Sequence, residues 1–163
     1  MPRCGVWYEG RTEVAAILHP TKTKIVNVER EGFDFLGFHF IATTKYPRAK
    51  SVEKLQTALR QKTKRTRGDS LHSIIRDANQ TLRGWYGYFQ ISRAGSHLFR
   101  RLDSWLRMRL RSILRPRAHR RGKDHQRWPN KFFETLGLFS LHAARVVRYI
   151  LSEVKEDATT EPP

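Results

Sequence analysis

Cysteine is almost absent from this chain of 163 residues, since Cys4 is the only one. A disulfide within the chain and a metal cluster held by thiolates are therefore excluded. Long apolar runs are absent as well, because no stretch approaches the roughly 20 residues that a membrane-spanning helix requires. The first residues lack the apolar core of a signal peptide. We therefore expect a cytoplasmic protein that acts away from membranes.

Acidic residues are scarce relative to basic ones. Lys and Arg number 32 against 15 Asp and Glu, which gives a net charge of +17 and an isoelectric point near 10.9. Such an excess indicates a polyanionic partner, either a nucleic acid or an anionic membrane surface. The four tryptophans are dispersed among arginines, a mixture that suits phosphate binding and base stacking better than adhesion to lipid.

Motifs for catalysis and for metal binding are missing too. The sequence has no GxSxG nucleophile motif, no Walker loop and no HExxH helix, and His119 and His125 stand in an arginine-rich segment without metal-ligand spacing. Two-metal nucleotidyl transfer requires clustered carboxylates, and no Asp-Asp pair occurs. We therefore expect no cofactor, no metal and no catalytic residue, and no enzyme activity from this chain alone.

The hydrophobic pattern predicts a mainly α-helical protein with a small β-hairpin. Residues 24–28 and 33–41 form β-branched and aromatic runs separated by a turn signal, with Gly37 inside the second run as a bulge or a point of close approach. Helices are expected over 52–65 with Ser51 as its cap, 69–90 capped by Asp69 or Ser70, 96–115, 130–136 and 140–151. The acidic end, 153–163, is expected to be disordered.

The second expected helix carries the most informative segment, LRGWYGYF at 82–89. At 3.6 residues per turn, Leu82, Trp85 and Phe89 continue the apolar stripe, whereas Gly84 and Gly87 fall on the outer side. Each glycine costs a helix about 1 kcal/mol relative to alanine. Either the helix frays near its end, or another backbone approaches closely at these glycines.

The third expected helix combines an apolar face with arginines. Arg100, Arg107, Arg111 and Arg115 gather opposite the apolar face and predict a positively charged ridge. Arg109 falls within the apolar face, where it either extends its charged end to solvent, pairs with a carboxylate, or marks a surface that meets RNA.

These segments together resemble one family. LRGWYGYF at 82–89, FRRLDSWLR at 99–107, and the later aromatic and glycine positions up to 141 resemble the maturase domain, or thumb, of group II intron-encoded reverse transcriptases. Upstream, LHPTKTKIV at 18–26 resembles the penultimate block of the palm in these enzymes, and FDFLGF at 33–38 resembles its final block, the primer grip. The resemblance covers about residues 17–151.

The resemblance implies four parts. Residues 1–16 match nothing, 17–46 are the end of a palm with its hairpin, 47–152 are the helical maturase domain, and 153–163 are the acidic tail. The Mg²⁺-binding palm of the complete polymerase has no counterpart, so the chain resembles a C-terminal fragment of a mobile-element protein. The resemblance places Phe35, Leu36 and Gly37 at a primer-grip-like turn and Lys22 near a nucleotide pocket.

The function implied by the resemblance is binding of structured group II intron RNA to assist its folding and splicing, in a bacterial cytoplasm or an organellar matrix. Two alternatives are a reverse transcriptase subunit completed by a separate catalytic palm and a degenerate fragment without activity. Self-association through the exposed phenylalanines of the hairpin is a further expectation. The residues expected to bind RNA are Lys50, Lys62, Lys64, Arg65, Arg67, Arg83, Arg100, Arg101, Arg107, Arg111, Arg115, Arg117, Arg120 and Arg121.

Overall fold

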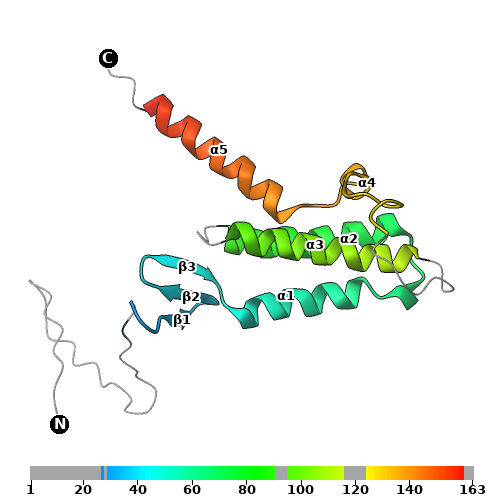
Figure 1. Cartoon of the computed structure of the whole chain (residues 1–163), viewed down its shortest axis with the longest axis horizontal. Coiled ribbons are helices and arrows are strands. Elements are labelled where there is room, and N and C mark those ends of the chain that lie inside the picture. Colours follow the sequence, from blue (N-terminus) through cyan, green and yellow to red (C-terminus); the bar gives the residue numbers. More distant parts are fainter. Residues whose placement is uncertain (1–26, 28, 91–94, 116–123, 160–163) are drawn as a thin grey trace, which may run out of the picture.

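The computed structural model describes residues 27, 29–90, 95–115 and 124–159. A three-stranded antiparallel sheet is followed by a bundle of helices (Figure 1). The elements are β1 (Phe33–Phe35), β2 (Phe38–Ile41), β3 (Thr44–Pro47), α1 (Ala49–Lys62), a 3₁₀ turn (Arg65–Arg67), α2 (Leu71–Phe89), α3 (Gly95–Leu114), α4 (Asn130–Thr135) and α5 (Leu141–Thr159). The predicted class, mainly helical with a small antiparallel sheet, is confirmed.

The run 33–41 is a complete hairpin rather than one strand. Phe35 pairs with Phe38, and Leu36 and Gly37 form the turn between them with φ values of 47° and 79°. Two successive positive φ angles are the geometry that matches the twist of a two-residue hairpin. The expectation that Gly37 lies inside a strand is therefore wrong, and the strand predicted at 24–28 lies, apart from Asn27, outside the described residues.

Gly37 is nevertheless a point of close approach. A Cβ atom added there would lie 3.1 Å from the Ser51 hydroxyl oxygen and 3.5 Å from the Phe89 ring. The Ser51 hydroxyl donates a 2.9 Å hydrogen bond to the Gly37 carbonyl, so Ser51 ties the hairpin to α1 and is not the helix cap that its position predicted. Helix α1 begins at Ala49, preceded by Arg48, whose side chain makes no capping bond.

The hairpin is held against the end of α2 by aromatic packing. Phe38 is buried, and its ring centroid lies 4.9 Å from that of Phe89 and 5.4 Å from that of Tyr88. The Tyr88 hydroxyl donates a 2.6 Å hydrogen bond to the Leu36 carbonyl. The aromatic end of α2 therefore positions the hairpin relative to the bundle.

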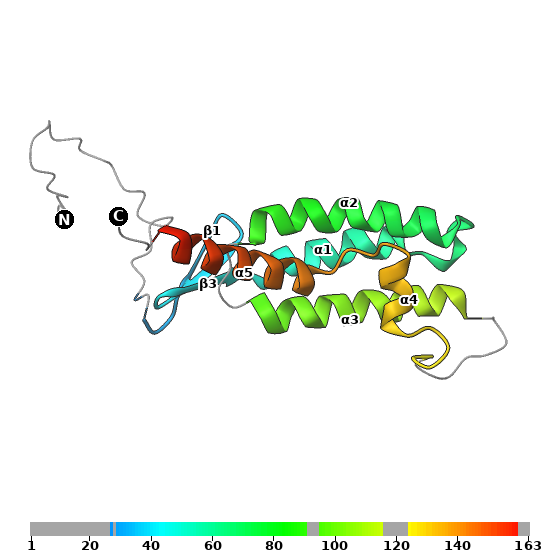
Figure 2. The same ribbon diagram turned by 90° about the horizontal axis from the view of Figure 1, so that it is seen from above.

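Helices α1, α2 and α3 share one core, and α4 and α5 lie on the side of the bundle away from α1 (Figures 1 and 2). The predicted stripe of α2 is confirmed, with Ile74, Ile75, Ala78 and Leu82 all buried. Ser70 caps α2 by accepting a hydrogen bond from the Ser73 backbone N–H at 3.2 Å. The core is completed by Leu55, Leu59, Phe99, Leu102, Leu106, Leu110, Phe133 and Leu141.

A buried carboxylate fixes the start of α5. Asp103 of α3 accepts hydrogen bonds from the Ser140 hydroxyl at 2.7 Å and from the backbone N–H groups of Leu141 and His142 at 3.1 Å each. The first N–H groups of a helix have no partner within the helix, and a carboxylate is well placed to accept from them. Asp103 therefore acts as the cap of a helix 37 residues further along the chain.

Helix α5 differs from its prediction in length and in packing. It continues to Thr159, although an end near Leu151 and a disordered segment after it were expected. Val147, Tyr149, Ile150 and Leu151 are each more than half exposed, so this helix presents an apolar side to solvent.

Candidate nucleic-acid interface

The arginines predicted to form a ridge on α3 contact segments that follow α3, although Arg100 stays exposed. Arg100 donates from Nε to His142 Nε2 at 2.9 Å, and Arg115 donates from Nε to Asp124 Oδ2 at 2.6 Å. Arg107 lies half-buried beside Asn130 and Glu134 of α4. The side of α3 opposite its apolar face is therefore partly covered by later segments of the chain, most completely at Arg111.

Arg111 is the clearest correction to the predicted ridge. Its side chain is 1% exposed. Its guanidinium donates from Nε to the Trp128 carbonyl and from Nη2 to Asn130 Oδ1, both at 2.8 Å, and it lies over the Phe133 ring. Burial lowers the pKa of Arg111, and the nearby Arg107 lowers it further. A side chain in this environment holds α4 against α3 and is out of reach of RNA.

Arg109 contacts hydroxyl and carbonyl oxygens of the protein, and among the described residues it has no carboxylate partner, which was one of the three alternatives. Its Nε donates to the Thr63 hydroxyl at 2.8 Å, and its Nη2 donates to the Thr63 carbonyl at 3.2 Å. It also lies over the Trp105 ring, on which Arg60 of α1 rests as well. Burial, followed by repulsion from Arg60, lowers the pKa of Arg109. Arg109 thus binds the carbonyl end of α1, where helix carbonyls lack partners.

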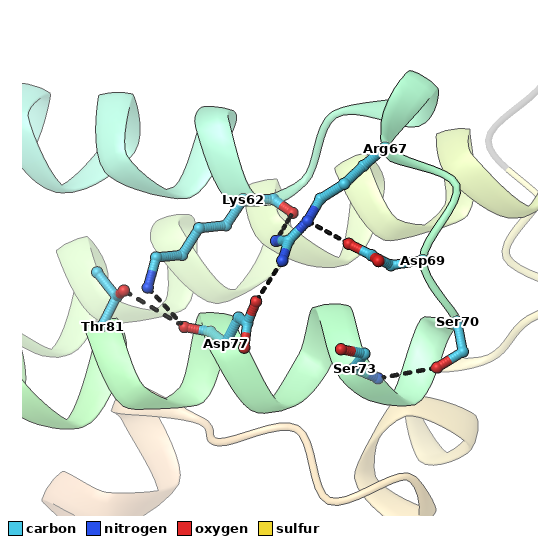
Figure 3. Close-up of polar contacts among 7 residues, drawn as sticks. All are labelled: Lys62, Arg67, Asp69, Ser70, Ser73, Asp77 and Thr81. Atoms are coloured by element: carbon cyan, nitrogen blue, oxygen red, sulfur yellow. Dashed lines mark hydrogen bonds and ion pairs between the residues drawn. The ribbon is translucent and has the colours of Figure 1, made fainter.

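The basic residues after α1 are also engaged with the protein (Figure 3). Arg67 pairs with Asp69 and donates from Nη2 to Asp77 Oδ2 at 2.6 Å. Lys62 donates from Nζ to the Asp77 carbonyl at 3.1 Å. The hydrogen bond from Arg67 lowers the pKa of the Asp77 carboxyl, and the same bond raises the pKa of Arg67.

Arg65 belongs to the same group, because it donates from Nη2 to the Arg115 carbonyl at 2.5 Å. Its guanidinium therefore meets the end of α3, in the way that Arg109 meets the end of α1. Of the cations predicted in this basic run, Lys62, Arg65 and Arg67 hold helix ends together. Arg65 and Arg67 are exposed and Lys62 is partly exposed, so these contacts do not by themselves remove the residues from an RNA surface.

The cations that remain available gather on α1. Lys50, Lys54 and Arg60 are exposed along the outer side of this helix, opposite its buried Leu55 and Leu59, and the exposed Lys64 follows two residues after the helix ends. Among the described residues, none forms an ion pair or a side-chain hydrogen bond with Lys50, Lys54 or Lys64. We refer to these four residues as the α1 basic face.

Outside α1, the predicted residues differ in their surroundings. Arg101 is exposed on α3, and no partner for its side chain occurs among the residues that the structure describes. Arg83 is exposed on α2 with its guanidinium over the Phe139 ring. Arg117, Arg120 and Arg121 lie outside the described residues. Lys54 and Arg60 belong to the basic run in the sequence, but only the fold shows that they share one side with Lys50 and Lys64.

The outer side of α2 is open at both glycines. A Cβ added at Gly84 or Gly87 would meet nothing within 4 Å in the described part of the chain. Leu82 and Phe89 are buried as predicted, and Trp85 is partly buried. Tyr86 is buried as well, and burial raises the pKa of its hydroxyl. No described residue supplies the close approach proposed for these glycines.

The primer-grip-like turn protrudes from the hairpin. Phe35 is 57% exposed and Leu36 is 67% exposed, whereas Gly37 faces Ser51 and Phe89 as described above. Two large apolar side chains at the tip of a hairpin indicate a surface that meets another molecule.

Comparison with protein families identifies the helical part. Residues 52–133, half of the chain, match the family described as "Group II intron, maturase-specific domain". The chain belongs to this family. A search of curated proteins finds no match.

The maturase-specific match begins in α1 and ends in α4. It therefore includes the three-helix core, Arg109 and Arg111, and all of the α1 basic face except Lys50. The hairpin and α5 lie outside it. Among the described residues, no three His, Cys, Asp or Glu side chains lie close enough to hold a metal ion. None of the described helices has the length and apolar character needed to cross a membrane.

Proposed function

We propose that this maturase-family protein binds structured group II intron RNA and assists its folding and splicing without catalysing bond changes itself. The match to the maturase-specific domain is the observation that carries the proposal. The net charge of +17 supports a polyanionic partner, because neutralising phosphates releases counterions and provides much of the affinity.

The α1 basic face is the contact surface in this proposal. Within α1, Lys50 and Arg60 are 10 positions apart, and a helix rises 1.5 Å per residue, so the helical part of the face extends about 15 Å. That length suits contacts with several successive phosphates. Its side chains are exposed and project from a helix whose other side is packed by Leu55 and Leu59. The core therefore holds the backbone that carries the charges within α1, and binding has to order only their side chains.

The proposal assigns different tasks to different arginines. Arg109 and Arg111 hold the ends of helices, whereas Lys50, Lys54, Lys64 and Arg101 are available to phosphates. A basic face alone binds any RNA, so recognition of folded intron RNA requires the arrangement of these cations to match the arrangement of phosphates in it.

Specificity is tested by comparing two RNAs of equal length at physiological salt. Purified protein is titrated into a labelled group II intron RNA and into an unrelated structured RNA, and the dissociation constants are measured by filter binding. The proposal expects tighter binding to the intron RNA. Equal affinities would leave only charge-driven binding and remove the maturase function.

The exposed hairpin favours a second candidate function. Phe35 and Leu36 at the tip, together with the 38% exposed Phe33, provide an apolar surface for a separate reverse transcriptase chain or for a second copy of this chain. Primer extension by a reverse transcriptase palm produced as a separate chain, with and without this protein, tests the first form. Size-exclusion chromatography of wild type and Phe35→Ser tests self-association. If the hairpin pairs two copies, we expect a dimer for wild type and a monomer for Phe35→Ser.

A further inference from the structure

A pocket lies where the hairpin meets the beginning of α1. It has a volume of about 430 Å³ and is lined by Asp34, His39, Tyr46, Arg48, Ala49 and Lys50. This volume falls within the range of small-molecule sites, about 300–1,000 Å³. Three strands and a helix contribute to the lining, so the pocket depends on the fold and not on one flexible loop.

The lining combines an aromatic surface with cations. The rings of Tyr46 and His39 lie 5.3 Å apart between centroids, and both side chains are partly exposed. Asp34 accepts a 2.7 Å hydrogen bond from His39 Nδ1 and pairs with Arg48 across 3.8 Å. Asp34 therefore neutralises part of the positive charge and leaves Lys50 without a counterion among the described residues.

Arg48 keeps donors that the protein does not use. Its guanidinium makes the single long ion pair with Asp34, and its buried Nε has no hydrogen-bond partner in the described chain. A guanidinium has five N–H donors arranged as a planar fork that fits a phosphate. Arg48 and Lys50 together thus provide a cationic edge beside the Tyr46 ring.

The pocket is continuous with the α1 basic face, because Lys50 belongs to both. An RNA strand that follows the α1 basic face reaches the pocket at the first turn of the helix. The pocket is open to solvent on the side of the exposed Lys50. The faces of a base paired in a duplex are covered by its stacked neighbours, whereas an unpaired base can leave its stack and rest on an aromatic ring.

We propose that this pocket receives one unpaired nucleotide of the bound RNA, with its base on Tyr46 and its phosphate on Arg48 and Lys50. The inference rests on the proposed RNA binding and adds the kind of RNA structure that is recognised. Folded RNA with bulged or looped nucleotides then binds more tightly than a continuous duplex.

The test compares two labelled RNA hairpins that differ by one bulged uridine in the stem. Their affinities for the full chain are measured by fluorescence anisotropy at one salt concentration. Because stacking of one base on an aromatic ring contributes roughly tenfold in affinity, the bulged RNA is expected to bind about tenfold more tightly. Equal affinities of wild type for the two RNAs would overturn the proposal.

Substitutions at Tyr46 and Lys64 test whether the preference for bulged RNA arises in the pocket. Tyr46→Leu is expected to abolish the preference for the bulged RNA, whereas Tyr46→Phe keeps the ring and keeps the preference. Lys64→Gln, at the far end of the α1 basic face, is expected to weaken both RNAs by the same factor and to leave the ratio unchanged. A preference that persists in a folded Tyr46→Leu protein would contradict the assignment.

Cross-linking provides a readout on the unaltered protein. A 4-thiouridine at the bulge is irradiated in the complex, and the modified peptide is identified by mass spectrometry. The adduct is expected within residues 44–50, and an adduct confined to another part of the chain would overturn the proposal. Failure of both RNAs to bind would instead refute the proposed RNA-binding function, and this inference with it.

Discussion

Replacement of Arg111 by methionine tests whether this arginine stabilises the fold or binds RNA. Methionine keeps an unbranched apolar stem in the core, but it is shorter and lacks the guanidinium that lies over the Phe133 ring. It removes both hydrogen bonds, to the Trp128 carbonyl and to Asn130 Oδ1. Arg101→Met on the same helix is the matched control, because Arg101 is exposed and its side chain makes no hydrogen bond or ion pair among the described residues.

The expected loss follows from these two bonds. A hydrogen bond from a charged donor contributes about 1.5–3 kcal/mol to stability. Relief from burying the guanidinium offsets part of the loss, so we expect Arg111→Met to lower the free energy of unfolding by about 2–4 kcal/mol. That is a large part of the roughly 5–15 kcal/mol that stabilises a typical domain. Arg101→Met is expected to change stability by less than about 0.5 kcal/mol.

Urea unfolding followed by circular dichroism measures the stability of each variant, and RNA titration measures its affinity for RNA. With slopes of about 1–3 kcal/mol per molar urea, the midpoint of Arg111→Met falls by roughly 1–2 M. Folded Arg111→Met protein should bind RNA as wild type does, whereas Arg101→Met should bind more weakly. A stable Arg111→Met protein that loses RNA affinity as Arg101→Met does would refute the structural role.

Three further predictions concern other contacts. Asp103→Ala removes three hydrogen bonds at the start of α5 and should cost about 2–3 kcal/mol in urea unfolding, with faster proteolysis in α5; an unchanged midpoint would refute the capping role. Gly84→Ala and Gly87→Ala should each stabilise α2 by up to about 1 kcal/mol, and a simultaneous loss of RNA affinity would indicate that a backbone approaches there. Because Arg67 lowers the pKa of Asp77, the stability difference between wild type and Asp77→Asn should be full at pH 7 and shrink as the pH falls below the ordinary carboxyl pKa of about 3.8; a difference that is the same at pH 3 and pH 7 would argue against this ion pair.

The helices could be predicted from the sequence because their signals are local. The stripe through Ile74, Ala78 and Leu82 repeats at helical spacing, and Ser70 stands where a cap is expected. The hairpin turn was missed because Leu36 is an unusual residue at positive φ, and the aromatic run hides the turn. Strand β3 was missed because it is short and begins in the basic run.

The candidate site was predicted only in part, because helical spacing does not show which segment covers which side. Arg111 lies on the polar side of α3 by spacing, yet α4 folds over it. Arg109 lies on the apolar side, and its partner is the end of α1, 46 residues earlier. Contacts between distant segments decided which arginines are buried, and no local pattern in the sequence encodes them.

The central claim is that the α1 basic face binds RNA phosphates, and the salt dependence of binding tests it most directly. Lys50→Gln, Lys54→Gln and Lys64→Gln are combined in one protein, and Arg127→Gln, Lys131→Gln and Arg148→Gln are combined in a control that loses the same charge beside α4 and on α5. Both proteins and wild type are titrated with intron RNA over a series of salt concentrations. The first variant should flatten the slope of log affinity against log salt by about two to three, since each lost phosphate contact contributes about 0.7–0.9, and the control should keep the slope of wild type. Equal changes in slope for the two variants would contradict the assignment of the interface to α1.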